Sequence, residues 1–133
     1  MIKLSTSCHL DARNAACLSV TSRADGGELR MLSGSEVVAT FALAPNAFEA
    51  PTDGTARCLG GNGNSPVSGT NALITNALRT ATIDGFDVRS PLGEWCWAGS
   101  VTKRGKGGDI QLDQTTVVLN QEIRLTRLSY HQP

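Results

Sequence analysis

Beyond residue 27, apolar and polar residues alternate with the period of two that is typical of half-buried strands. Gly, Pro, Asn and Asp interrupt the alternation at short intervals, which indicates about eight strands joined by turns. Strands at this spacing predict a mainly β fold, a single antiparallel β-sandwich-like domain over residues 1–133. The predicted strands lie around residues 28–32, 37–43, 55–59, 79–88, 95–97, 101–106, 110–113, 117–119 and 122–130.

The start of the chain follows a helical pattern instead. Hydroxyl side chains at residues 5–7 are suitable N-caps, and alanines recur at near-helical spacing behind them. Asp25, Gly26 and Gly27 then end the pattern, because glycine adopts the left-handed conformation that closes a helix. One N-terminal helix is therefore predicted over about residues 9–23.

Several segments depart from regular alternation. Apolar positions change parity across Asp84–Gly85, which predicts a bulge, and again near Arg127, which predicts a register shift or burial on both faces. The segment 60–69, GGNGNSPVSG, holds little to bury and predicts an exposed, flexible loop that is open to contacts in an assembly. Residues 71–78 fit either a strand or a helical turn, with the strand favoured.

Composition excludes several classes of function and location. Twelve basic and twelve acidic residues leave the 133-residue chain without net charge, so no overall field attracts nucleic acid or an anionic membrane. No apolar run approaches the ~20 residues that span a bilayer. Polar residues at 11, 13 and 14 argue against a signal peptide and for synthesis in a cytoplasm. In that reducing compartment free, mostly buried thiols are expected, rather than disulfides or zinc ligands, at Cys8, Cys17, Cys58 and Cys96.

The most distinctive aromatic motif is a tryptophan pair. Trp95 and Trp97 are predicted to share one face of a strand, with Cys96 on the other. Two tryptophans on one face could stack on a sugar ring, as in carbohydrate-binding modules. The favoured interpretation places both in the core, because only 5% of the residues are aromatic and the domain needs its largest side chains inside.

A basic group lies at the tip of a predicted hairpin. Lys103, Arg104 and Lys106 precede the turn Gly107–Gly108. Three charges without interleaved aromatic residues are a weak nucleic-acid signal. We expect a solvated end or a salt bridge to another subunit, with contact to a phosphate as the third alternative.

No motif in the chain is typical of catalysis. Nothing marks either His9 or His131 as the base that activates a nucleophile. Carboxylates on strands beside glycine turns, at Asp84, Asp109 and Asp113, are usually solvated rather than bound to metal. The stretch GGNGNS lacks the Lys-Ser/Thr pair of a phosphate-binding loop. We therefore expect no enzymatic activity, no cofactor and no metal site.

A series of strand and turn motifs suggests a family. In chain order they are ARNAA in the helix, GELRMLSG, VVATFALAPNAFEAP, TATIDGFDV, WCWAGSV and GGDIQLDQTTVVLNQEIRLTRLSY. Together they resemble a family of short tailed-phage virion structural proteins, from about residue 5 to residue 129. The chain departs from the family pattern in its richer Cys and Arg content and in the aromatic WCW strand.

The resemblance implies a virion component, with a capsid decoration (cement) protein that bridges major capsid subunits as the leading role. Major capsid protein or other virion proteins are the expected partners, with a homo-oligomer, preferably a trimer, as the acting form. The alternative is a neck, tail or fibre component that binds a host glycan through Trp95 and Trp97. The residues expected to contact other subunits are Leu4, His9, Asn62, Asn64, Lys103, Arg104, Lys106 and Tyr130.

Overall fold

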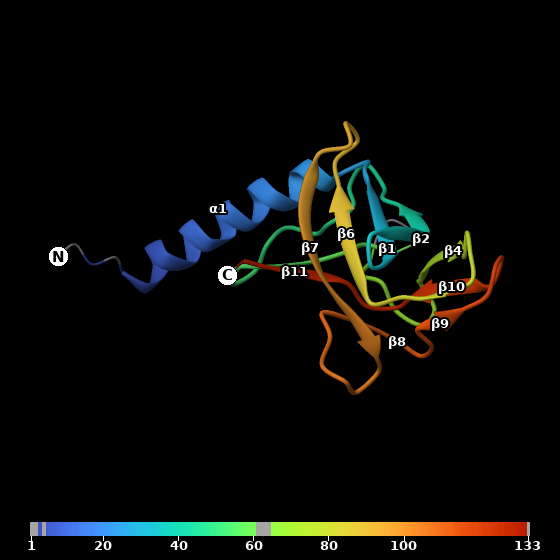
Figure 1. Ribbon diagram of the computed structural model, residues 1–133. Coiled ribbons are helices and arrows are strands. Elements are labelled where there is room, and N and C mark those ends of the chain that lie inside the picture. The colour runs from blue at the N-terminus through green and yellow to red at the C-terminus, as the bar shows by residue number, and fades with distance from the viewer. Residues whose placement is uncertain (1–2, 4, 61–64, 133) are drawn as a thin grey trace.

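A 19-residue helix precedes a group of short strands in the computed structural model, which describes residues 3, 5–60 and 65–132 (Figure 1). The helix, α1 (Thr6–Ala24), begins earlier than predicted, because the Ser5 hydroxyl accepts a hydrogen bond from the Cys8 N–H at 3.2 Å. It ends at the predicted glycine turn, where Gly26 has a φ of 73°.

The prediction of a mainly β fold with one N-terminal helix is confirmed. Two predicted strands are each divided, so the described residues form more strands than predicted. One division lies at residues 83–84, where a bulge was expected and the chain instead passes to another sheet, and the other lies near Arg127. The strands are β1 (Glu28–Ser33), β2 (Glu36–Ala42), β3 (Thr55–Arg57), β4 (Leu73–Asn76), β5 (Ala81–Thr82), β6 (Gly85–Arg89), β7 (Trp95–Lys103), β8 (Ile110–Leu112), β9 (Thr116–Val117), β10 (Glu122–Leu125) and β11 (Ser129–His131).

The largest sheet has five strands in the order β2-β1-β6-β7-β8. Its first four strands are antiparallel neighbours. β8, however, runs parallel to β7, with Val101 beside Ile110, which corrects the prediction of a fully antiparallel fold. Parallel neighbours usually need a long crossover. The short loop 104–109 suffices here because β8 pairs with only the last three residues of β7. The predicted basic hairpin at residues 103–106 is therefore a loop between parallel strands.

The core lies between this sheet and three two-stranded sheets, β10-β4, β11-β3 and β5-β9. One connected cluster of buried apolar side chains joins Met31 and Phe41 of the large sheet with Val117 and Leu125 of the small ones. The two groups of strands thus form the layers of a sandwich-like domain.

The loop predicted at residues 60–69 is partly packed. Val67 belongs to the core cluster, and its N–H donates to the Cys58 carbonyl at 2.9 Å. The expectation of an exposed, flexible segment is therefore wrong at Val67, where a single apolar side chain reaches the core. Residues 61–64 lie outside the described part of the chain. The preference for a strand within residues 71–78 is confirmed by β4.

Candidate functional site

The N-terminal half of α1 extends away from the sheets (Figure 1). All side chains from Thr6 to Arg13, here called the helix arm, are exposed, including the predicted contact residue His9. The arm is tied to the domain at its inner end, where Arg13 Nη1 lies 3.1 Å from Asp53 Oδ1. Among the described residues, no helix has the length of apolar sequence needed to cross a membrane.

One stripe of α1 faces the domain, at positions that recur every three or four residues. Three of its side chains are buried and the fourth, Asn14, accepts a hydrogen bond from the Gly54 N–H at 2.7 Å. Leu10 continues the stripe one turn further out, where its side chain is 36% exposed. The buried members of the stripe are Cys17, Thr21 and Ala24.

A second exposed surface, here called the apolar end, consists of Leu78, Val118 and Leu119. More than half of each of these side chains is exposed to solvent. The backbone around them is ordered, because the Leu78 N–H donates to the Val38 carbonyl at 2.7 Å and the Leu119 N–H to the Thr80 hydroxyl at 3.0 Å. The sequence did not predict this surface, because Val118 and Leu119 were interpreted as part of a strand. Three consecutive apolar residues at 117–119 were the available signal, since a strand buries only alternate ones.

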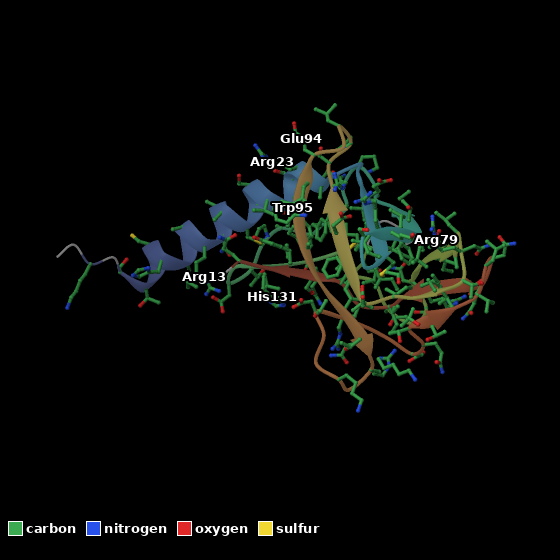
Figure 2. All side chains as sticks on the ribbon, viewed as in Figure 1. Arg13, Arg23, Arg79, Glu94, Trp95 and His131 are labelled. Carbon is green, nitrogen blue, oxygen red and sulfur yellow. The ribbon has the colours of Figure 1, made fainter. Side chains whose placement is uncertain are left out.

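The two surfaces lie at opposite ends of the molecule. The helix arm points to one side of the sheets, whereas the strands β4, β9 and β10 that border the apolar end lie on the other (Figure 1). Arg79, which follows Leu78 directly, is labelled at that far end in Figure 2. A partner bound at one end therefore leaves the other end free for a second partner.

The basic group at residues 103–106 is a solvated loop. Arg104 Nε lies 2.8 Å from Asp113 Oδ1, and both side chains are largely exposed. Such a pair contributes little to stability in water. Lys103 and Lys106 are exposed as well, without an ion pair among the described residues. The loop therefore keeps two cations available to a partner.

The two tryptophans do not share a face. The register shifts between β6 and β7, so that Trp97 pairs with Val88 and Trp95 pairs with Arg89. Neighbouring residues of β6 face opposite sides of the sheet, which places Trp97 on the core side and Trp95 on the outer side. Trp95 is 61% exposed, whereas Trp97 packs against the core, as does Cys96. The prediction that both tryptophans lie in the core is therefore wrong for Trp95.

Trp97 belongs to an aromatic cluster with the predicted contact residue Tyr130. Its ring centroid lies 4.8 Å from that of Tyr130 and 5.5 Å from that of Phe48. Partial burial raises the pKa of the Tyr130 hydroxyl. Tyr130 is therefore half-buried against Trp97, and its contact with another subunit stays a prediction.

A groove of about 360 Å³ opens beside this cluster. Its walls combine aromatic rings with polar and charged side chains, namely Phe86, Trp97, Asp109, Arg127, Tyr130 and His131. The Nδ1 atom of His131 lies 2.8 Å from the Thr55 hydroxyl oxygen. Sequence reasoning missed the groove, because its walls come from strands that are distant along the chain.

The outer face of the large sheet carries a partly buried ion pair. Arg30 donates to both carboxylate oxygens of Asp87, from Nε at 2.8 Å and from Nη2 at 2.6 Å, and Arg89 Nε donates at 3.3 Å. These contacts, led by the hydrogen bonds from Arg30, lower the pKa of Asp87 although burial acts in the opposite direction.

The three aspartates considered as metal ligands have separate structural partners. Asp84 accepts from the Gly34 N–H at 3.1 Å, Asp109 accepts from the Ser100 N–H at 2.9 Å, and Asp113 pairs with Arg104. Among the residues that the structure describes, no group of His, Cys, Asp and Glu is suited to hold a metal ion.

The cysteines are free thiols, three of them at least partly buried. Burial raises the pKa of Cys58 to about 12, which keeps its thiol protonated and poorly reactive. Cys17 is buried too, whereas Cys8 lies exposed on the helix arm.

Three of the predicted contact residues, Leu4, Asn62 and Asn64, lie outside the described residues. The structure thus places His9 on the helix arm and the lysines on the basic loop, without bringing them together. Comparisons with protein-family models, with curated proteins and with solved structures found no match to this chain.

Proposed function

We propose that this protein is a bacteriophage virion structural subunit, a capsid decoration protein that bridges neighbouring major capsid subunits. The observation that carries the proposal is the pair of exposed surfaces at opposite ends, the helix arm and the apolar end. A bridging subunit needs two such surfaces, because one contact alone cannot hold two partners together. The resemblance of the strand and turn motifs to phage virion proteins suggests that the two partners are subunits of a capsid.

The helix arm has the physical character of a segment that a partner stabilises. Short helices without tertiary packing are marginal in water, and the arm receives almost none from the domain. Leu10 is the apolar side chain that a partner would cover, since it continues the stripe that α1 uses for packing. Docking of the arm on a partner would bury Leu10 and would also stabilise the helical conformation of the arm.

The mechanism is additive binding across joints between capsid subunits. A subunit that binds the assembled shell, and not its separated parts, stabilises the shell by mass action. A trimer at local three-fold positions would present three copies of each surface, so that weak contacts combine into tight binding. The resulting bridges oppose the opening of joints under internal pressure.

The Trp95 and Trp97 geometry does not favour the glycan-binding alternative. A sugar ring stacks on rings that share one face, whereas these two lie on opposite faces of the large sheet.

Charges introduced on the two surfaces are expected to weaken binding to capsids. We expect Leu10→Asp and Leu119→Asp each to reduce affinity for undecorated shells about tenfold or more, because a buried carboxylate without a partner opposes docking. Leu92→Asp is the matched control, since Leu92 is 86% exposed in a turn outside both surfaces. Co-sedimentation with shells measures the occupancy, after circular dichroism has shown that each variant is folded. Equal binding by all three variants would contradict bridging through these surfaces.

A further inference from the structure

The outer edge of β7 is only partly covered by another strand. β7 has nine residues, and β8 pairs with the last three, Val101–Lys103. Residues 95–100 pair with β6 on one side and with no strand on the other, within the described part of the chain. Proteins usually protect such an edge with lysine, proline or a covering segment. At its centre this edge instead has Ala98 and Gly99.

The backbone at Ala98 presents a free donor and a free acceptor. The Val101 N–H points toward β6, since it donates to the Asp84 carbonyl at 3.1 Å. The Ser100 N–H points the other way, to Asp109 Oδ2 at 2.9 Å. Because the direction alternates along a strand, the Ala98 N–H and C=O also point outward. The described residues provide no hydrogen-bond partner for either group.

The groove described above lies directly beside this edge, and Ala98 contributes to its wall. In a strand added along β7, the residue opposite Ala98 would face the outer side of the sheet. The residues before and after it would point to the core side, as Trp97 and Gly99 do. One of these side chains would enter the groove against Trp97 and Tyr130. The other would lie beside Gly99, close to Asp109 and Phe86, whose atoms come within 3.0 Å of a Cβ built at Gly99.

The groove also holds a cation without an ionic partner. Arg127 lines it and forms no ion pair with any described residue. The carboxylate of Asp109 is held by the Ser100 N–H and hydroxyl, at 2.9 and 3.2 Å. An incoming carboxylate would therefore find a free guanidinium, and an incoming ring would find aromatic walls.

We propose that the free edge of β7 is a strand-addition site for an extended segment of a partner protein. The segment carries a large apolar side chain and a carboxylate two positions apart, on either side of the residue that pairs with Ala98. Main-chain hydrogen bonds provide the affinity, and the groove selects the side chains. The site does not depend on the proposed role in a virion, because it needs only the edge and the groove.

Two synthetic pentapeptides test this site, acetyl-Thr-Phe-Thr-Glu-Thr-amide and acetyl-Thr-Glu-Thr-Phe-Thr-amide, which cover both strand directions. We expect at least one to bind the full chain with a Kd below about 1 mM in isothermal titration or NMR titration. Methylation of the central threonine nitrogen removes the donor to Ala98 and is expected to weaken binding at least tenfold. Arg127→Gln should weaken the Glu peptide but not its Gln counterpart.

Ala98→Pro is the protein-side test, with Ala98→Val as control. Proline removes only the outward N–H, so the pairing of β7 with β6 is retained while strand addition is blocked. We expect Ala98→Pro to lose peptide binding and Ala98→Val to keep it. If Ala98→Pro fails to fold, the methylated peptide decides. The proposal is overturned if neither peptide binds, or if methylation and Ala98→Pro leave binding unchanged. It is also overturned if sedimentation shows a dimer of the parent chain that Ala98→Pro abolishes, because a second copy then occupies the edge.

Discussion

Phe41→Ala is expected to lower the free energy of unfolding by about 3–5 kcal/mol, the largest loss for any single side chain considered. Phe41 lies on β2 opposite Leu29, is 2% exposed and belongs to the cluster that joins the two layers. Truncation removes the buried ring and leaves a cavity that the surrounding strands can fill only in part. Urea denaturation at neutral pH measures the change from the shift in midpoint.

Leu92→Ala is the control for Phe41→Ala, because Leu92 lies in a turn and is already in contact with water. It should leave the midpoint unchanged. Since a domain of this kind has a total stability of about 5–15 kcal/mol, Phe41→Leu provides a milder variant that stays folded. Similar midpoints for Phe41→Ala and Leu92→Ala would mean that the Phe41 ring is not packed in the core.

Asp87→Asn is expected to cost about 2–3 kcal/mol, because it leaves the Arg30 guanidinium without the carboxylate that neutralises it. The loss lies at the lower end for a buried pair, since the Arg30 side chain is 23% exposed. Asp113→Asn is a matched control: its partner Arg104 donates at the same 2.8 Å, but both side chains are in water. Chemical denaturation of the two variants should show a loss for the first and no measurable change for the second.

The effect of Asp87→Asn should depend on pH in a defined direction. The pKa of Asp87 is lowered in the folded chain, mainly by hydrogen bonds from Arg30. Its stabilisation is therefore fully present above the unfolded-state pKa of about 4 and is lost as the pH falls through the folded-state pKa. The stability difference between parent and variant should shrink below pH ~4. A difference that stays constant into acid would show that the charge of Asp87 is not what Arg30 recognises.

Features governed by nearby residues were predictable from the sequence. The helix ends at Gly26 because a glycine can take the left-handed conformation, whatever packs around it. The parity of apolar side chains located the two irregular points, before Gly85 and near Arg127, but it predicted a bulge and a register shift, whereas the strands end there and the chain continues in another sheet. Only the end of the helix is decided by a local interaction.

Features governed by partner strands were not predictable. The sequence around Trp95 and Trp97 predicts simple alternation along a strand. The pairing with β6 contains a bulge, however, and the two rings therefore lie on opposite faces of the sheet. Arg30 and Asp87 lie 57 residues apart, so nothing in the sequence indicates that they meet. The groove beside Trp97 likewise depends on how β11 crosses β7. Of the predicted contact residues, His9 and the lysines of the basic loop are exposed, whereas Tyr130 packs inward.

Whether this chain bridges capsid subunits is answered by its copy number in purified virions that contain it. Quantitative mass spectrometry of gradient-purified particles gives the ratio of this chain to the major capsid protein. A decoration subunit should be present in a fixed ratio to that protein, at on the order of hundreds of copies per particle. Absence from such particles, or a copy number of only about a dozen as at a neck or tail with ring symmetry, would contradict the proposed function.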